Sequence, residues 1–163
     1  MSPTRRLRIY LDTSVINFLF AEDAPDFRKA TEEFFSRHAA RYNLFISNIV
    51  VLEIGRDPNP EHRALLERAL ANHGIVELPG EPRDEIEMIA RSYIEAGIIS
   101  VNKAEDAFHV AYATVHQMDV LLSWNFRHLA NVRREARFLA INQQLGYRYP
   151  LRLVSPLEVE DDD

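Results

Sequence analysis

The sequence predicts an α/β fold in which helices cover both faces of a central, mostly parallel sheet. Short β-prone runs alternate with helical segments along the chain, and connections of that length join parallel strands. The 163 residues, 47% of them hydrophobic, are enough to bury one core without disulfides. We therefore expect a single globular domain over residues 1–156, followed by an acidic tail over 157–163.

Five short runs of apolar and β-branched residues are predicted as strands, because polar or turn-forming residues bound each of them. They cover residues 7–11, 44–46, 75–78, 119–123 and 151–154. Asp12 directly follows the first run, and Asn125 lies just past the fourth. In a parallel sheet the functional crevice lies beyond the carboxyl ends of the strands, so both side chains are expected there.

Helices are predicted between these strands, where apolar residues recur at helical spacing. Start signals occur at Thr13 and Ser14, Pro25, Ser47 or Asn48, Glu61, Asp84 and Asn102, and a last helix is expected to run through Arg137. Gly55, Gly74 and Gly97 are the expected stops of three of these helices, since glycine readily adopts the backbone conformation that ends a helix.

The segment 102–113 carries an acid at a place where a helix core disfavours one. Its apolar residues form an inward stripe, and Asn102 with Glu105 is expected to form a capping box at the helix start. Asp106 has no such explanation, because it lies at the edge of the stripe without a Lys or Arg three or four residues later. Acids in such positions are seldom buried unless they are paired or bind a metal.

Asp12, Glu53, Asp106 and Asn125 are expected to converge at the carboxyl edge of the sheet, and Glu53 lies inside the apolar helix 49–54. Converging carboxylates repel each other unless a cation lies between them. Oxygen ligands without a His or Cys cluster favour Mg²⁺ or Mn²⁺, which would activate water for phosphodiester cleavage. Asp12 and Asp106 are the expected principal ligands. Glu53 is expected to bind a second ion or orient the water, and Asn125 to act as a neutral ligand or donor.

Two groups of residues near this cluster are candidates for holding a phosphate. Thr13 or Ser14 could bind a phosphate oxygen through a hydroxyl or a helix N-terminal N–H. The basic residues that could line the rim are Lys103, Arg127, Arg133, Arg134 and Arg137, each of which is equally well explained as part of a solvated helix face. Trp124 is interpreted as core packing rather than as a base-stacking platform.

Each acid also has a structural interpretation that needs no metal. Asp12 can be a helix N-cap, and Asp106 can extend the acidic first turn of its helix. Glu53 can pair with Arg56, three residues later. His109 is expected to be a hydrogen-bonded core or rim histidine rather than a ligand.

The composition restricts the function and the compartment. The formal net charge of −6 argues against a protein that coats nucleic acid, because such binding needs many phosphate contacts. With no cysteine, thiolate metal sites are excluded and a reducing compartment is expected. We see no signal peptide before the first strand and no apolar run near the roughly 20 residues of a membrane helix. A cytoplasmic protein that does not bind membranes is therefore expected.

Four stretches together resemble the PIN-domain ribonucleases, of the kind found as VapC-type toxins in type II toxin–antitoxin systems. They are residues 9–14, 46–54, 104–113 and 121–129, in this order on alternating strands and helices. The resemblance implies a Rossmann-like three-layer α/β/α sandwich and endonucleolytic cleavage of RNA that depends on Mg²⁺ or Mn²⁺. It assigns the three core acids of the family to Asp12, Glu53 and Asp106. It also implies a homodimer and a cognate antitoxin.

The sequence departs from the family at Asn125, where many members have Asp. Affinity for a hard cation falls with each lost ligand charge, so the second ion would be held less tightly. The leading hypothesis is a metal-dependent endoribonuclease. The alternative is a weak or inactive PIN-like domain that binds RNA or a protein. An aspartyl-nucleophile phosphatase is disfavoured, since Ser14 stands where that chemistry has a second Asp.

Overall fold

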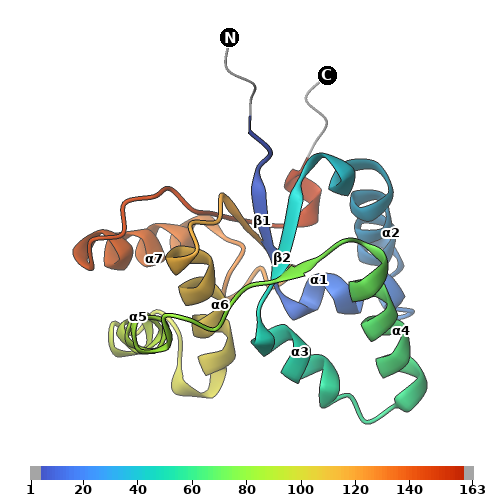
Figure 1. Ribbon diagram of the computed structural model, residues 1–163, viewed down its shortest axis with the longest axis horizontal. Helices are drawn as coiled ribbons and strands as arrows, with labels where there is room; N and C mark the ends of the chain where they lie inside the picture. Colours follow the sequence, from blue (N-terminus) through green and yellow to red (C-terminus); the bar gives the residue numbers. More distant parts are fainter. Residues whose placement is uncertain (1–4, 160–163) are drawn as a thin grey trace.

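In the computed structural model, which describes residues 5–159, a five-stranded parallel sheet runs through the centre of the molecule (Figure 1). The strands are β1 (Arg8–Leu11), β2 (Asn43–Ile46), β3 (Val76–Glu77), β4 (Val120–Leu122) and β5 (Arg152–Val154). Their order in the sheet is β3-β2-β1-β4-β5, so β2 and β3 lie on one side of β1, and β4 and β5 lie on the other. The switch point, where such folds place their functional crevice, therefore lies between β1 and β4.

Seven α-helices cover the described part of the sheet. They are α1 (Thr13–Asn17), α2 (Pro25–Glu33), α3 (Asn48–Gly55), α4 (Pro60–Asn72), α5 (Arg83–Glu95), α6 (Ala104–Val115) and α7 (Val132–Gln144). Figure 1 shows α1, α2 and α4 on one side of the sheet and α5, α6 and α7 on the other. The fold is a three-layer α/β/α sandwich, as the sequence predicted.

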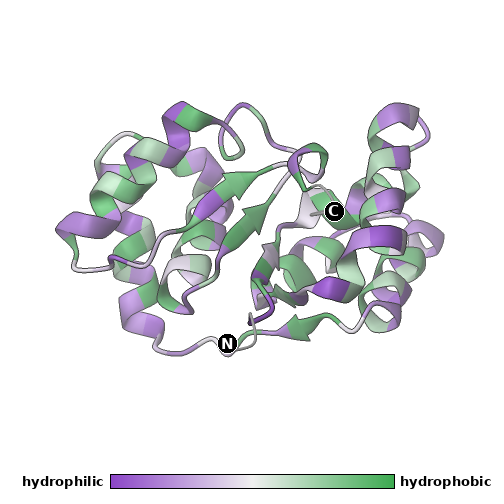
Figure 2. Ribbon diagram, turned by 90° about the horizontal axis from the view of Figure 1, so that it is seen from above, coloured by the Kyte–Doolittle hydropathy of each residue, from purple (hydrophilic) through white to green (hydrophobic). Residues whose placement is uncertain are grey.

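The central strand β1 is buried on both faces and supplies both cores. Ile9 and Leu11 pack in the core formed with α1 to α4, while Tyr10 points into the core formed with α5 to α7. This alternation follows from the two-residue period of a strand. Figure 2 shows the strands as predominantly hydrophobic and the helices with hydrophilic outer faces. The alternation also sets the place of one polar group, because it directs the Tyr10 hydroxyl toward α6.

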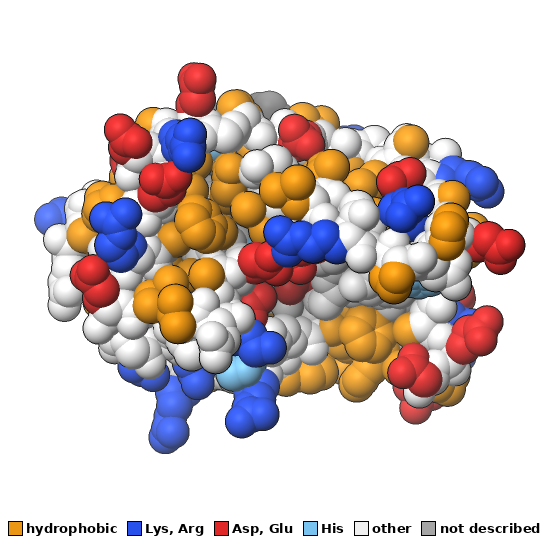
Figure 3. All heavy atoms as spheres, turned by 90° about the horizontal axis from the view of Figure 1, so that it is seen from below, with side chains coloured by type: hydrophobic (Ala, Val, Ile, Leu, Met, Phe, Trp, Pro, Cys, Tyr) orange, Lys and Arg blue, Asp and Glu red, His pale blue; other side chains and the backbone are white. Residues whose placement is uncertain are grey.

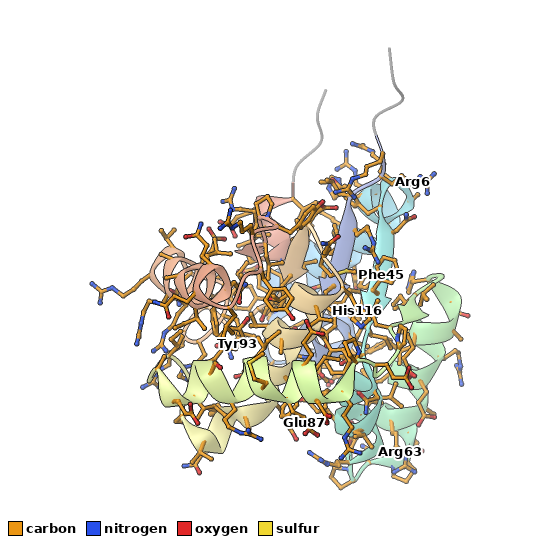
Figure 4. All side chains as sticks on the ribbon, turned by 60° about the vertical axis from the view of Figure 1, so that its left-hand side comes forward. Arg6, Phe45, Arg63, Glu87, Tyr93 and His116 are labelled. Atoms are coloured by element: carbon orange, nitrogen blue, oxygen red, sulfur yellow. The ribbon has the colours of Figure 1, made fainter. Side chains whose placement is uncertain are left out.

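The layer formed by α5, α6 and α7 includes a small buried polar cluster. Tyr93 is fully buried on the inner side of α5, and its hydroxyl bonds Thr114 of α6 at 3.2 Å and also Asn142 of α7. Glu87 instead accepts a hydrogen bond from Arg83 along the outer surface of α5, at 3.0 Å (Figure 4). The three helices are thus joined by polar contacts inside an otherwise apolar layer.

The amino-terminal edge of the sheet is held by one acid, Asp119, just before β4. Its carboxylate accepts from both terminal nitrogens of Arg5, at 3.0 and 2.7 Å, and from the backbone N–H of Arg8 at 2.7 Å. The Tyr149 hydroxyl donates to the same carboxylate. Asp119 is therefore a structural acid whose charge is neutralised by a guanidinium group.

The capping box predicted at the start of α6 is wrong. Asn102 lies inside a 3₁₀ turn, Val101–Lys103, and α6 begins after it at Ala104 without a side-chain cap. Glu105 does not reach back to the chain; it forms an ion pair with Arg56 at the end of α3. The predicted inward stripe of α6 is confirmed, since the residues on it are buried.

Other predicted boundaries differ from the structure by a few residues. The last helix continues to Gln144 rather than ending at Arg137, because Phe138 and Asn142 are buried against the α5–α6 layer. Near the C-terminus, Ser155 caps a short 3₁₀ turn at Pro156–Glu158, and the rest of the expected acidic tail, 160–163, lies outside the described residues. Within residues 5–159, no helix is long and apolar enough to cross a membrane.

Candidate active site

Asp12 connects the carboxyl ends of β1 and β4. It is 3% exposed and accepts hydrogen bonds from the hydroxyls of Ser14, at 2.5 Å, and of Ser123. It also caps α1 through the N–H of Val15 at 3.4 Å, so the N-cap interpretation is confirmed. Burial raises the pKa of Asp12 above its usual value, while His109 and the two hydroxyls partly oppose that rise.

Asp106 lies in the first turn of α6 and contacts the segment after β4. Asn125 donates an amide hydrogen bond to its carboxylate at 3.3 Å, and the Asn125 carbonyl oxygen accepts from the N–H of His128 at 2.9 Å. Burial and, to a smaller extent, the negative charges of Asp12 and Glu53 raise the pKa of Asp106 to about 6, while the charge of His109 opposes the rise. The three acids from β1, α3 and α6 therefore lie close enough to affect one another's charge.

Glu53 lies on the inner side of α3, whose outer face exposes Val51 and Leu52. Its carboxylate accepts a hydrogen bond from Nε2 of His109 at 2.8 Å. Burial alone would raise the pKa of Glu53, but the hydrogen bond and charge of His109 outweigh it and leave the pKa below its usual value. The alternative pairing with Arg56 is not what holds this acid, since the side chain of Arg56 bonds elsewhere.

His109 is a buried histidine at 2% exposure, as predicted. Burial would lower its pKa, but the hydrogen bond to Glu53 and the charges of Asp12, Glu53 and Asp106 raise it. The imidazole of His109 therefore interacts electrostatically with all three candidate acids.

Thr13 brings an unsatisfied polar group to the acids. Among the residues described, its buried hydroxyl oxygen has no hydrogen-bond partner of good geometry. It still lies near enough to the Glu53 carboxylate to help lower the pKa of that acid. A buried hydroxyl without a partner is rare in folded proteins and is available to an incoming oxygen ligand.

The donor set fits a hydrated divalent cation. Within residues 5–159, no three acids or histidines are already gathered around one point as in a closed metal cage. Mg²⁺ does not require such a cage, because it keeps several waters and binds through one or two carboxylates and the substrate's phosphates. Asp12 and Asp106, with raised pKa values, offer hard oxygen ligands of that kind.

Figure 3 views the carboxyl edge of the sheet and shows acidic side chains in a hollow with basic side chains on its rim. Burial lowers the pKa of His128, and the charges of Arg134, Arg127 and Lys103 lower it further, so these three basic residues gather around it. Lys103 also acts on Asp106, lowering its pKa. The other two rim candidates, Arg133 and Arg137, are exposed on α7.

Trp124 packs in the core, as the sequence analysis favoured. It is 5% exposed, its indole N–H donates to Thr31 at 2.8 Å, and its ring lies 4.6 Å from that of Phe27. Phe126, which follows Asn125 in the chain, is 43% exposed, and its ring packs 5.9 Å from that of Trp124.

Ser123 is a site residue that the sequence did not predict. Its hydroxyl donates to Asp12 and accepts from the N–H of Asn125 at 2.9 Å, which joins two candidates that are far apart in the sequence. The signal was present, because Ser123 is a polar residue directly after a fully apolar strand and two residues before Asn125.

Comparisons with known proteins identify the fold of this chain and its family. It is similar to a chain of VapBC2 from Rickettsia felis bound to a DNA fragment from their promoter, with 15% identity, a TM-score of 0.57, and coverage of 91% of this chain and 98% of that one. A chain of FitAcB from Neisseria gonorrhoeae is similar with 18% identity and a TM-score of 0.56, and the match covers 93% of this chain and 99% of that one. For a chain of DNA-bound VapBC from Salmonella typhimurium the identity is 15% and the TM-score 0.55, and the match covers 92% of this chain and 98% of that one. No curated protein matches the sequence. Since the model of the PIN domain family matches residues 9–135, the chain belongs to the PIN domain family.

Proposed function

We propose that this protein is a Mg²⁺- or Mn²⁺-dependent endoribonuclease and the toxin of a toxin–antitoxin pair. The observation that carries the proposal is the meeting of Asp12, Glu53 and Asp106, which come from three different elements and affect one another's charge. Burial, together with the charges of Asp12 and Glu53, raises the pKa of Asp106 to about 6. Mutually repelling carboxylates at a switch point are costly without a cation.

Asp12 and Asp106 would hold the ion, with Glu53 beside them. A bound Mg²⁺ or Mn²⁺ would supply an activated water and neutralise charge at the phosphate. The hydroxyls of Ser14 and Ser123 fix the direction of the Asp12 carboxylate. Glu53, whose lowered pKa keeps it ionised, would accept a hydrogen bond from the attacking water and orient it.

The residues around the acids would position the RNA. The Thr13 hydroxyl, which has no good partner among the described residues, would donate to a phosphate oxygen. Arg127 and Lys103 are exposed, their charges act on His128, and that of Lys103 also acts on Asp106, so both would contact backbone phosphates beside the acids. The protein as a whole is acidic, so this local basic rim would supply the electrostatic attraction.

Two kinds of protein partner are part of the proposal. The similar structures are VapBC and FitAcB assemblies, which supports a cognate antitoxin for this chain. Val51 and Leu52 are 41% and 51% exposed on the outer face of α3, an apolar surface that supports contact with a second copy.

The test is cleavage of a structured RNA by purified protein with Mg²⁺ or Mn²⁺. Asp12→Asn and Asp106→Asn should each lower the rate at least about 100-fold, because each removes a ligand charge from the ion. Asp119→Asn is the matched control, since it makes the same chemical change at the opposite edge and should keep the activity. Equal cleavage by the wild type and the Asp12 and Asp106 variants would identify a contaminant and overturn the proposal.

One observation favours the alternative, a domain that binds RNA without cleaving it. The amide of Asn125 donates to the Asp106 carboxylate and so partly satisfies it without a metal. Retention of labelled RNA by the wild type, with no products in either metal, would select this alternative.

A further inference from the structure

A chain of buried hydrogen bonds lies behind the three acids. The Ser47 hydroxyl is 2.7 Å from that of Tyr10, which is 2.6 Å from Nδ1 of His109. The other ring nitrogen of His109 donates to Glu53 at 2.8 Å. Ser47 and Tyr10 are fully buried and His109 is 2% exposed, so these three side chains are shielded from bulk water, while Glu53 at the end is 24% exposed.

The three elements that carry the acids each contribute to this chain. Tyr10 precedes Asp12 by two residues on β1, and His109 follows Asp106 by one helical turn on α6. Ser47 is the N-cap of α3, the helix that carries Glu53. A change in the position of any one element would break a hydrogen bond in the buried chain.

The direction of the hydrogen bonds makes the chain end on Glu53. An ionised carboxylate can only accept, so Nε2 of His109 is the donor whether the ring is neutral or charged. In the neutral ring, Nδ1 accepts from the Tyr10 hydroxyl, whose oxygen accepts from Ser47. Ser47 in turn accepts from the N–H of Ile49 at 3.2 Å. Every polar side-chain group in this series of hydrogen bonds then has a partner, and the imidazole is held at both nitrogens.

Packing alone does not account for these side chains. Burying a hydroxyl or an imidazole has a desolvation cost that an apolar side chain of similar size avoids. A fully satisfied polar network instead specifies one arrangement of its elements. Histidines and carboxylates that orient the ligands of a metal commonly use such partners.

We propose that Ser47, Tyr10 and His109 form a positioning network that fixes the Glu53 carboxylate and the placement of β1, α3 and α6, and thereby sets the affinity of the acids for Mn²⁺ or Mg²⁺. The inference rests on the proposed metal-dependent function. In this proposal the three residues act through Glu53 and would contact neither the ion nor the RNA.

The test compares two buried tyrosines. Tyr10→Phe removes the hydroxyl that holds His109. Tyr112→Phe is the control, because Tyr112 of α6 donates to Asn48 of α3 at 2.6 Å and so links the same two helices outside the network. Mn²⁺ affinity of the metal-free full chain, measured by calorimetry, should fall about three- to tenfold in Tyr10→Phe, because this variant loses the hydrogen bonds to Ser47 and His109 that hold the network. It should fall less than about twofold in Tyr112→Phe, which loses only the bond to Asn48, outside the network.

His109 gives a second pair of variants. His109→Leu should weaken Mn²⁺ binding by about 10- to 100-fold, the usual effect of losing an outer partner of a metal ligand. His109→Gln should restore much of this loss, because its amide nitrogen can donate to Glu53 from the same place. Such a restoration would show that His109 acts through its hydrogen bond to Glu53 rather than by filling space in the core. Near-ultraviolet circular dichroism checks that each variant is folded.

The outcomes separate this inference from the proposed function. Network-dependent Mn²⁺ binding without RNA cleavage would overturn the nuclease and keep the network. Equal Mn²⁺ affinity in the wild type, Tyr10→Phe and His109→Leu would overturn the network even if RNA is cleaved. Equal losses in Tyr10→Phe and Tyr112→Phe, or a wild type that binds no Mn²⁺ at millimolar concentration, would overturn it too.

Discussion

The two edges of the sheet treat buried or half-buried acids in opposite ways. At the amino-terminal edge, Asp119 is neutralised by a guanidinium group, and a backbone N–H and a tyrosine hydroxyl satisfy it further. At the carboxyl edge, hydroxyls hold Asp12 and an amide holds Asp106. The charges of Asp12 and Glu53 raise the pKa of Asp106, while those of His109 and Lys103 lower it. An acid that already has a permanent cation serves structure. Acids held by neutral donors keep their charge available for a cation that arrives.

The largest expected effect of this difference is on thermal stability in Mn²⁺. An ion at about 100 times its Kd adds about 2.7 kcal/mol to the free energy of unfolding. For a chain of this size that raises Tm by roughly 5–10 °C. Scanning calorimetry should show the shift in the wild type and in Asp119→Ala but not in Asp106→Ala. An equal shift in Asp106→Ala would place the ion elsewhere and break the comparison.

A smaller effect is expected when the carboxyl edge is made more acidic. Asn125→Asp replaces the amide that donates to Asp106 with a like charge, so Tm of the metal-free protein should fall. Mn²⁺ affinity should increase by about tenfold, because affinity for a hard cation rises with ligand charge. Titration calorimetry measures the affinity.

Asn59→Asp is the matched control for Asn125→Asp. Asn59 caps α4, away from the acids, and Asp caps a helix as well as Asn does. It should leave Mn²⁺ affinity unchanged. A gain of equal size in both variants would show that overall charge, rather than the site, controls binding.

The smallest expected effect is the pH dependence of the metal-free protein. Burial raises the pKa of Asp106 to about 6 and raises that of Asp12, so the folded state binds protons more tightly than the unfolded chain. The free energy of unfolding should therefore fall as pH rises from about 4 through about 6, although the lowered pKa of Glu53 opposes this fall at the acid end. His109, with a raised pKa, acts in the same direction as Asp106 and Asp12.

Urea denaturation in a chelator at several pH values measures this slope. Asp106→Asn should flatten it, because the variant lacks one of the groups that bind a proton on folding. An increase of stability from pH 4.5 to 6.5 in the wild type would contradict the raised pKa values. In saturating Mn²⁺ the slope should reverse, since the ion and the protons compete for the same oxygens.

The fold was predictable because its signals are local. Apolar runs identified all five strands, and the chain's alternation of strands and helices gave a parallel sheet with helices on both faces. The errors came from contacts between distant elements. Glu105 left its expected capping role for Arg56 of α3, and Asn142 extended α7 because it reaches Tyr93. Neither partner can be read from neighbouring residues.

The candidate site also contains residues that were predictable from local sequence and residues that were not. Asp12, Asp106 and Asn125 were selected because a polar residue at the end of a strand or at the edge of an apolar stripe is conspicuous in a sequence. Tyr10 and Ser123 were missed, since tyrosine within a strand and serine after one are ordinary. Their importance depends on the strand order, which places β4 beside β1 and directs Tyr10 toward α6.

The hydrogen bond between Ser123 and Asp12 closes a loop that spans 111 residues. During synthesis, β1 leaves the ribosome first, but it acquires β4 as a neighbour only after more than two thirds of the chain has been made. Asp12 consequently remains in a solvated, incomplete setting throughout most of translation. Whatever chemistry the completed pocket performs, a chain that stops before α6 and β4 cannot perform it, because it lacks Asp106 and Ser123.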